Sequence, residues 1–182
     1  PQNEFRAGLA EVIKYGVISD ASLFDYLENN VEKILKLDHE CLAHIIKTSC
    51  AIKAEVVEKD ERESHYRMIL NFGHTLGHAI EALTGYSQFI HGEAVAIGMV
   101  YAAKLSQQLG KCQGAVSSRL SKLVNKFGLP SHWPDLDSPA VIECLYHDKK
   151  TMNNKIKFIL IKDIGRVEIV EDMPEADILK IL

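Results

Sequence analysis

Apolar residues recur at intervals of three and four along most of the chain, the spacing that gathers them on one face of an α-helix. Asp20 and Asp38 each stand directly before such a segment, where a carboxylate can cap the first turn of a helix. Gly128 and Pro130 follow the last segment and favour a helix end. The pattern predicts helices over residues 4–18, 21–30, 39–60, 66–83, 92–109 and 115–127. In the third of these, the predicted core face comprises Leu42, Ile45, Ile46, Cys50 and Val57.

The periodicity changes only near the C-terminus. Residues 155–161 (KIKFILI) alternate as a strand does, residues 163–165 supply a turn, and residues 166–170 (RVEIV) form a hairpin partner. A short last helix is expected within residues 176–182. There is no internal repeat and no linker rich in Pro, Gly or Ser. The sequence therefore predicts a mainly α fold, a single domain over residues 1–182 with a small β-hairpin near its C-terminus.

Composition narrows the class of partner. The chain has 182 residues, 47% of them hydrophobic, which suits one well-buried core. The net charge is -4, and the 21 basic residues form no dominant cluster, so nothing favours nucleic acid or an anionic membrane surface. A small-molecule or protein partner is expected instead. Four cysteines without CxxC pairing, no signal and no apolar run of bilayer length predict a reduced, cytoplasmic protein.

A second pattern lies within RMILNFGHTLGHAIE, residues 67–81. Its polar side chains alternate at intervals of four and three, so on one helix over residues 66–83 they would form a single stripe. The positions between them are apolar, which predicts a buried helix whose stripe lines a cleft for a metal, an anion or a polar substrate. Gly73 and Gly77 indicate close approach by a neighbouring backbone or ligand. The stripe comprises Arg67, Asn71, His74, His78 and Glu81.

Two other segments offer metal ligands. His91 begins an apolar segment in HGEAVAIGM, and Glu11 lies three residues before Lys14 in AEVIKYG. A carboxylate with two imidazoles is a common ligand set for a catalytic zinc. From the residues alone, His74 and His78 would pair as an H-x-x-x-H metal site, and Glu11 with Lys14 could equally be an i,i+3 ion pair.

Cationic residues suggest an anionic substrate. Lys53 lies within CAIKAEVV, and Lys149 and Lys150 lie within HDKKT. Together with Arg67 they could clamp a molecule that carries more than one negative charge. By composition alone Lys149 and Lys150, and Glu63 in the charged run DERE, are typical of a solvated surface.

Six strings occur here in the order seen in 3-dehydroquinate synthases: AEVIKYG, KAEVV, DERE, R-x-x-x-NFGHTLGHAIE, HGEAVAIGM and DKK. Each is weak alone, but six in register argue against chance similarity. The chain therefore resembles the C-terminal half of the 3-dehydroquinate synthase family almost from end to end. The resemblance implies the helical C-terminal domain of the dehydroquinate synthase-like fold.

The resemblance also implies residue roles. The metal ligands would be Glu11, His74 and His91. His78 would be a proton acceptor near the substrate rather than a ligand, and Glu63 would be the other proton acceptor. The substrate's carboxylate, phosphate and hydroxyl groups would be held by Lys14, Lys53, Arg67, Asn71 and Lys149, with Lys150 able to share the role of Lys149.

The family reaction is implied in the same way. It converts 3-deoxy-arabino-heptulosonate 7-phosphate into 3-dehydroquinate and phosphate, in the shikimate route to aromatic amino acids. The enzymes are lyases that use zinc, or cobalt in its place, and NAD. The C5 hydroxyl is oxidised, phosphate leaves, the ketone is reduced again, and the ring opens and recloses as an aldol. The resemblance further implies a homodimer for the complete enzyme.

One family feature has no counterpart in this sequence. NAD binds mainly to an N-terminal α/β domain with a Gly-rich turn in that family, and no G-x-G-x-x-G follows a strand here. The opening PQNEF matches a point just after that domain. We therefore expect the N-terminal NAD-binding α/β domain to be absent from this chain, and the chain alone to hold zinc weakly, to bind NAD poorly and to be inactive.

Two alternatives stay open. One is a related enzyme of the same scaffold, either a sugar-phosphate cyclase that makes inosose or valiolone rings or a metal-dependent polyol dehydrogenase. The oxyanion-binding set of Lys53, Arg67, Asn71 and Lys149 favours a carboxylated substrate over these. The other is a noncatalytic helical interaction module. Its histidines would be polar residues of the core and would take up no stoichiometric metal.

Overall fold

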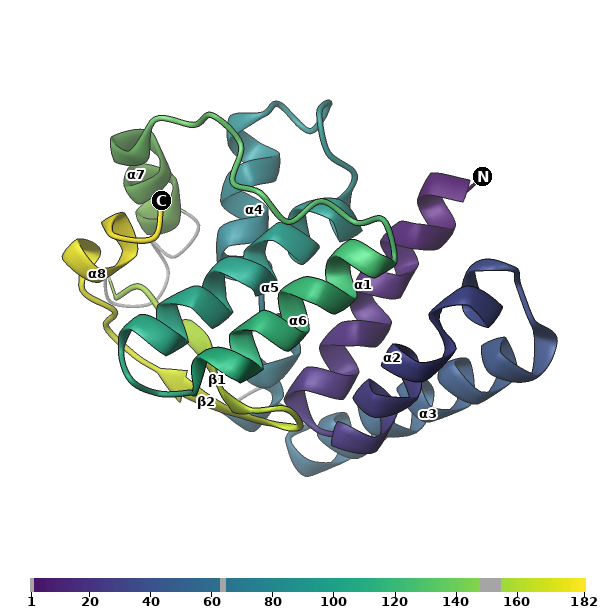
Figure 1. The fold of residues 1–182 in the computed structure, drawn as a ribbon. Helices are drawn as coiled ribbons and strands as arrows, with labels where there is room; N and C mark the ends of the chain where they lie inside the picture. Colours follow the sequence, from purple (N-terminus) through teal and green to yellow (C-terminus); the bar gives the residue numbers. More distant parts are fainter. Residues whose placement is uncertain (1, 63–64, 148–154) are drawn as a thin grey trace.

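The computed structural model describes residues 2–62, 65–147 and 155–182 and has a mainly α fold. The longest helix of this part of the chain, α3, is paired with α2 at one side of the molecule, and the hairpin lies near α8 at another (Figure 1). The predicted fold class is confirmed. The elements are α1 Gln2–Ile18, α2 Ala21–Leu35, α3 His39–Lys59, the 3-10 helix η1 Tyr66–Asn71, α4 His74–Leu83, α5 His91–Gln108, α6 Gly114–Lys126, α7 Ser138–His147, β1 Phe158–Asp163, β2 Arg166–Val170 and α8 Glu175–Leu179.

Helix α5 is the centre of the fold. Its sequence is apolar almost all the way round, as expected of a helix buried on every side. It packs against α1, α4, α6 and β1, and Figure 1 shows it between α4 and α6. Residues Ala94, Val95, Ala96 and Ile97 are fully buried in succession. The many alanines and glycines of this helix let its neighbours come close, which matters for the site described below.

The predicted helix starts at α2 and α3 are confirmed by their caps. Asp20 Oδ1 accepts a hydrogen bond of 3.0 Å from the backbone N–H of Leu23, and Asp38 Oδ1 accepts one of 3.0 Å from that of Cys41. A side-chain acceptor at this position satisfies a backbone donor that has no partner within the helix. Helix α2 extends to Leu35, beyond the predicted end, across a kink at Asn30.

The predicted hairpin is also confirmed. Strands β1 and β2 pair in antiparallel fashion with Ile159 opposite Ile169, and Gly165 turns the chain with φ of 80°. The turn is tied to the helices because the Gly165 N–H donates to the Val17 carbonyl over 2.9 Å. Buried Ser106 on α5 accepts a hydrogen bond of 2.9 Å from the Ile161 N–H. The hairpin therefore covers one side of the helical core.

The single helix predicted over residues 66–83 is wrong. The structure has the 3-10 turn η1, then an extended Phe72, then Gly73 in the left-handed region with φ of 81°, and only then α4. A β-carbon on Gly73 would lie 2.8 Å from Met99 N and 2.9 Å from Val95 O on α5. The close approach predicted for Gly73 is thus confirmed, but this tertiary contact accompanies a break in the helix rather than a continuous stripe.

Two further helix predictions need correction. On α3 the buried face is Cys41, Ile45, Ser49, Ile52 and Val56. Of the residues predicted for this face, Ile46 is 59% exposed and Cys50 is exposed as well. The apolar positions of this helix fit two neighbouring faces, and packing against α1 and α2 selects one of them. Helix α7 was not predicted, although it carries buried Val141 and Leu145. Among the described residues, no helix is both long and apolar enough to cross a membrane.

Candidate metal centre

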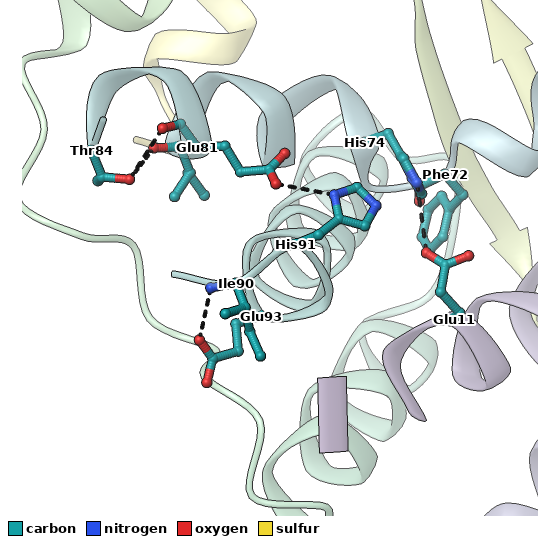
Figure 2. A network of polar contacts seen from close by, with 9 residues as sticks. Glu11, Phe72, His74, Glu81, Thr84, Ile90, His91 and Glu93 are labelled. Atoms are coloured by element: carbon teal, nitrogen blue, oxygen red, sulfur yellow. Dashed lines mark hydrogen bonds and ion pairs between the residues drawn. The ribbon is translucent and has the colours of Figure 1, made fainter. Parts of the chain in front are cut away.

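Three side chains from separate elements converge at one place. Glu11 lies in the middle of α1, His74 is the first residue of α4, and His91 is the first residue of α5. Each offers a ligand atom, and these atoms lie within 4.8 Å of one another. Glu11 Oε1 is 3.6 Å from His74 Nε2, and the two imidazole centroids are 5.2 Å apart. Figure 2 shows the three side chains directed toward a shared space.

Glycines bring these three elements together. A β-carbon at Gly92 would collide with the carbonyl group of Ala7 on α1, and one at Gly98 would collide with the carbonyl oxygen of Gly73. A β-carbon at Gly77 would stand 3.3 Å from Ala94. Helix α5 can therefore approach both α1 and the start of α4 at backbone contact. This spacing places His91 beside Glu11 and His74.

A backbone contact with Phe72 fixes the orientation of the His74 ring. Its Nδ1 lies 3.2 Å from the Phe72 carbonyl oxygen, which can only accept, so Nδ1 carries the hydrogen and Nε2 presents a lone pair toward Glu11. Burial, reinforced by the positive charge of Lys14, lowers the pKa of His74 to about 4. At neutral pH the imidazole is therefore uncharged, the form that binds a metal.

Glu11 makes an ion pair with Lys14 and also faces the space that it shares with His74 and His91, which is called the centre below. Its Oε2 accepts a hydrogen bond of 2.6 Å from Lys14 Nζ, the i,i+3 ion pair that the sequence left open as an alternative. Burial lowers the pKa of Lys14, and the Glu11 carboxylate opposes that shift. Glu11 Oε1 is also buried but has no hydrogen-bond partner among the described residues. A buried carboxylate oxygen without a donor is costly, and a cation between Glu11 and His74 would satisfy it.

The donor set fits a divalent transition metal. Two neutral imidazoles and one carboxylate form a ligand set of catalytic zinc sites, which keep a further position for water or substrate. The side chain of His91 is 51% exposed and that of Glu11 33% exposed, so solvent reaches the centre. These residues can hold such an ion and leave one side of it accessible.

His91 also belongs to a second possible donor set, with His78 and Glu81 on α4. The His91 Nδ1 is 3.1 Å from Glu81 Oε1. The imidazole of His78 is 5.5 Å from that of His74 and 6.1 Å from that of His91, centroid to centroid. The bond between Glu81 and His91 spans ten residues and was not predicted. Sequence reasoning placed Glu81 only in the stripe, without a partner.

The other predicted site residues differ in burial and in their distance from the three converging side chains. Lys14 is buried at the centre, and Lys53 on α3 is near enough for its charge to lower the pKa of Lys14. Asn71 ends η1 and is exposed, whereas Arg67 is the second residue of the same turn and is half-buried. Two predicted residues, Glu63 and Lys149, and with them Lys150, lie outside the described residues. Their predicted roles are not tested by the structure.

A pocket of about 450 Å³ lies between α4 and α7, next to the centre. His78 and Thr75 line it from α4, and Cys144 and His147 line it from α7. The imidazole of His78 thus lies beside those of His74 and His91 and also lines this pocket. This arrangement suits proton transfer with a molecule bound there.

Known proteins resemble this chain over its whole length. The family model described as 3-dehydroquinate synthase C-terminal matches residues 8–151. A 3-dehydroquinate synthase of Thermoanaerobacter pseudethanolicus is 50% identical over 181 residues, covering 100% of this chain and 51% of the relative. One of Dictyoglomus thermophilum is 52% identical over 186 residues with the same coverage. The chain thus spans about half the length of the curated relatives it matches.

Solved structures share the fold. A 2-epi-5-epi-valiolone synthase from Streptomyces hygroscopicus, with NAD+ and Zn2+ bound, superposes with a TM-score of 0.89 at 23% identity, over 99% of this chain and 50% of that one. A 2-deoxy-scyllo-inosose synthase in complex with carbaglucose-6-phosphate, NAD+ and Co2+ superposes with a TM-score of 0.83 at 25% identity. The match covers 99% of this chain and 52% of that one.

Proposed function

The chain belongs to the 3-dehydroquinate synthase C-terminal family, and on that premise we propose that it is the metal- and substrate-binding half of a 3-dehydroquinate synthase. The complete enzyme would be a lyase that converts 3-deoxy-arabino-heptulosonate 7-phosphate into 3-dehydroquinate and phosphate. The observation that carries the proposal is the convergence of Glu11, His74 and His91 within 4.8 Å. Relatives about 50% identical over the whole chain bear the name of this enzyme.

In this proposal Glu11, His74 and His91 hold zinc, or cobalt in its place. A divalent cation bound there would supply Lewis-acid stabilisation of the charge that develops on substrate oxygens. His74 binds through Nε2, because Nδ1 donates to Phe72. Glu11 binds through Oε1, because Lys14 occupies Oε2. Lys14 thus fixes the rotamer of the carboxylate and also brings positive charge to the edge of the substrate site.

The remaining proposed roles concern the substrate. His78 would accept and return protons from the pocket side, with Glu63 as a second proton acceptor. Positive charge would hold the carboxylate and phosphate of the substrate while the intermediates react. Lys14 and Lys53 lie close enough to interact electrostatically, so both contribute positive charge near the proposed metal centre. The proposed substrate-binding residues are Lys14, Lys53, Arg67, Asn71 and Lys149.

The redox cofactor and the partner follow from the family. We propose that NAD binds mainly to an α/β half that is not part of residues 1–182, since the relatives are about twice as long as this chain. The exposed ligand of the centre, His91 at 51%, would then face that half and the substrate. The 2-deoxy-scyllo-inosose synthase of the same fold is complexed with NAD+ and Co2+, which supports the same cofactor pair here. We further propose a cytoplasmic homodimer for the complete enzyme.

A metal titration tests the proposal. Wild-type chain is titrated with Co2+ at pH 8, and binding is followed by the visible absorption of the bound ion. The wild type is expected to bind one equivalent. Glu11→Ala and His74→Ala should each weaken binding at least about tenfold, because each removes a ligand. His132→Ala, which removes an exposed histidine outside both donor sets, is the control. No uptake by wild type, or equal uptake by all four proteins, would reject the metal centre.

A second measurement separates the proposed substrate from those of related cyclases. The chain is combined with a separately expressed NAD-binding half of a 3-dehydroquinate synthase, with NAD and zinc present. Phosphate release from 3-deoxy-arabino-heptulosonate 7-phosphate is expected, and none from glucose 6-phosphate, since only the first substrate offers a carboxylate to the basic residues. The chain alone should release none. The reverse preference would assign the chain to a different cyclase.

A further inference from the structure

Glu81 makes a contact that the proposed function does not use. It lies in the last part of α4, and its Oε1 is 3.1 Å from Nδ1 of His91 at the start of α5. The side chain of Glu81 is 11% exposed, whereas that of His91 is 51% exposed. A nearly buried carboxylate thus holds an imidazole that is otherwise open to solvent. A carboxylate at this depth needs a hydrogen-bond donor, and His91 provides one.

The bond determines which nitrogen of His91 is available. A carboxylate oxygen accepts, so Nδ1 carries the hydrogen and Nε2 is left with its lone pair. The two nitrogens of an imidazole point to opposite sides of the ring. Figure 2 shows Glu81 on one side of the His91 ring and His74 on the other. The lone pair of Nε2 is therefore directed toward the space shared with Glu11 and His74.

Packing makes this contact possible. Gly77 lets α4 pass α5 closely, since a β-carbon there would stand 3.3 Å from the backbone of Ala94 and Val95. Glu81 follows Gly77 by about one helical turn and so lies on the same side of α4. The close crossing of the two helices brings the Glu81 carboxylate within hydrogen-bond distance of His91. A larger separation would leave both side chains without this partner.

We propose that Glu81 is a positioning residue for the metal centre: it fixes the tautomer and the ring orientation of His91, and it is not itself a ligand. This rests on the proposed metal binding by Glu11, His74 and His91. His74 is held in the same manner by the Phe72 carbonyl. Each proposed imidazole ligand thus has a hydrogen-bond acceptor at its Nδ1, the nitrogen that does not bind the metal. Such acceptors raise the basicity of the ligand nitrogen and remove the cost of orienting the ring on binding.

The competing interpretation uses the same residues differently. His78, Glu81 and His91 could themselves hold the ion, because their ligand atoms also lie within 4.8 Å of one another. In that case Glu81 would be a direct ligand and Glu11 would be dispensable. The wild-type geometry favours the positioning role, because Nδ1 of His91 is already engaged by Glu81 and Glu11 Oε1 is the buried oxygen that lacks a donor.

The test uses two variants and a matched control on the 182-residue chain. Glu81→Gln keeps an acceptor oxygen for Nδ1, whereas Glu81→Ala removes it. Glu93→Gln is the control: Glu93 is two residues from His91 and its Oε2 accepts from the Ile90 N–H, a bond that Gln can also make. Two quantities are measured at pH 8. They are the tautomer of His91 in the metal-free chain, from long-range 1H–15N NMR, and the Co2+ affinity with its visible spectrum.

We expect wild type, Glu81→Gln and Glu93→Gln to show the Nδ1–H tautomer at His91, and Glu81→Ala to lose it. Glu81→Ala should bind Co2+ about 10–100-fold more weakly, with an altered spectrum but still one equivalent, as is typical when such an acceptor is removed. Glu81→Gln should lose less, and Glu93→Gln should match wild type. A Glu81→Gln protein that folds keeps the test valid if Glu81→Ala does not fold.

Three results would overturn the inference, and they differ from one another. An unchanged tautomer and Co2+ affinity in both Glu81 variants would remove the positioning role while leaving the metal centre in place. Loss of Co2+ binding in Glu81→Gln, together with retained binding in Glu11→Ala, would make Glu81 a ligand of the second donor set. No Co2+ binding by the wild type would reject the proposed function and this inference together.

Discussion

Gly98 on α5 stands in backbone contact with Gly73, the residue that precedes α4: a β-carbon on Gly98 would collide with the Gly73 carbonyl oxygen and lie 3.0 Å from Gly77 N. Gly73 in turn has φ of 81° and would meet Met99 N at 2.8 Å if it carried a β-carbon. A side chain on either glycine would thus meet backbone atoms of the opposite segment. Their contact sets how closely the helix that begins with His74 approaches the helix that begins with His91.

The first prediction concerns Gly98→Ala. The new methyl group cannot fit without moving α5 away from the Gly73 segment, because the atoms it meets are backbone atoms. We expect a loss in free energy of unfolding of about 1–3 kcal/mol or more, as is usual for overpacking. Co2+ affinity should fall as well, since His74 and His91 move apart. Urea unfolding and Co2+ titration check the two effects.

Gly8→Ala provides the matched control. Gly8 lies in α1, and a β-carbon there would meet nothing within 4 Å. Alanine favours a helix interior over glycine by about 1 kcal/mol, so this variant should unfold at the same or a higher urea concentration. A Gly98→Ala protein as stable as Gly8→Ala, with unchanged metal affinity, would show that the close contact with Gly73 does not control the centre.

The second prediction concerns Ser106→Ala. The buried Ser106 hydroxyl donates to the Ala102 carbonyl over 2.7 Å and accepts from the Ile161 N–H over 2.9 Å, which ties the hairpin to α5. Alanine would leave the Ile161 N–H buried without this acceptor, at a cost of about 1–3 kcal/mol in the free energy of unfolding. Exposed Ser118→Ala on α6 should change stability by less than about 0.5 kcal/mol. Equal unfolding midpoints for the two variants would contradict the prediction.

Local signals explain why much of the fold could be predicted. The caps Asp20 and Asp38 act on donors only three residues away. The hairpin is given by alternation on both sides of a turn at Gly165. These features need no knowledge of distant residues. The element type was therefore correct wherever a strong period and a terminal signal occurred together.

The errors arose where distant contacts decide. The spacing of Asn71 and His74 fits a continuous helix, yet the chain breaks between them at Gly73, where α5 approaches. Exposed Ile46 shows the same effect on α3, whose apolar residues offered two possible faces. The pairing of Glu81 with His91 joins two helices and left no local signal. For the site, the convergence of Glu11 with two histidines depends on tertiary structure, and only the family resemblance singled them out.

The third prediction concerns Asp60, at the end of α3. This residue is 8% exposed, and its Oδ2 accepts hydrogen bonds of 2.8 Å from the His65 N–H and 3.0 Å from the Arg67 N–H. Asp60→Ala would leave both donors without this acceptor and lower the free energy of unfolding by about 1–3 kcal/mol. Asp60→Asn keeps one acceptor oxygen and should lose less. Both are compared with exposed Glu58→Ala on the same helix by urea unfolding.

If the Asp60 carboxylate orders the start of η1, amide hydrogen exchange at His65 and Arg67 should speed up in Asp60→Ala more than in Asp60→Asn. Exchange that is equally slow in all the variants would show that other contacts hold the turn. The comparison matters for function because Arg67 is a proposed substrate-binding residue, and a disordered turn would weaken anion binding without removing any charge.

The fourth prediction is a pH dependence of the metal-free chain that originates in His74. Burial, aided by Lys14, holds the pKa of this imidazole at about 4 in the folded state, against 6.5 for an ordinary histidine. Between these two values the unfolded chain binds a proton that the folded chain does not. Stability therefore rises with pH in this window: the contribution is fully present above about 6.5 and is lost as the pH falls toward 4.

The test compares wild type with His74→Asn by urea unfolding at several pH values from 7.5 down to 5, with a chelator present. The difference in free energy of unfolding between the two proteins should shrink as the pH falls, by about 1–2 kcal/mol over the range. Ser118→Ala, which removes no titrating group, should keep the wild-type slope. A difference between wild type and His74→Asn that is constant with pH would show that burial of this imidazole does not lower its pKa, and that protons compete with the metal for His74 near neutrality.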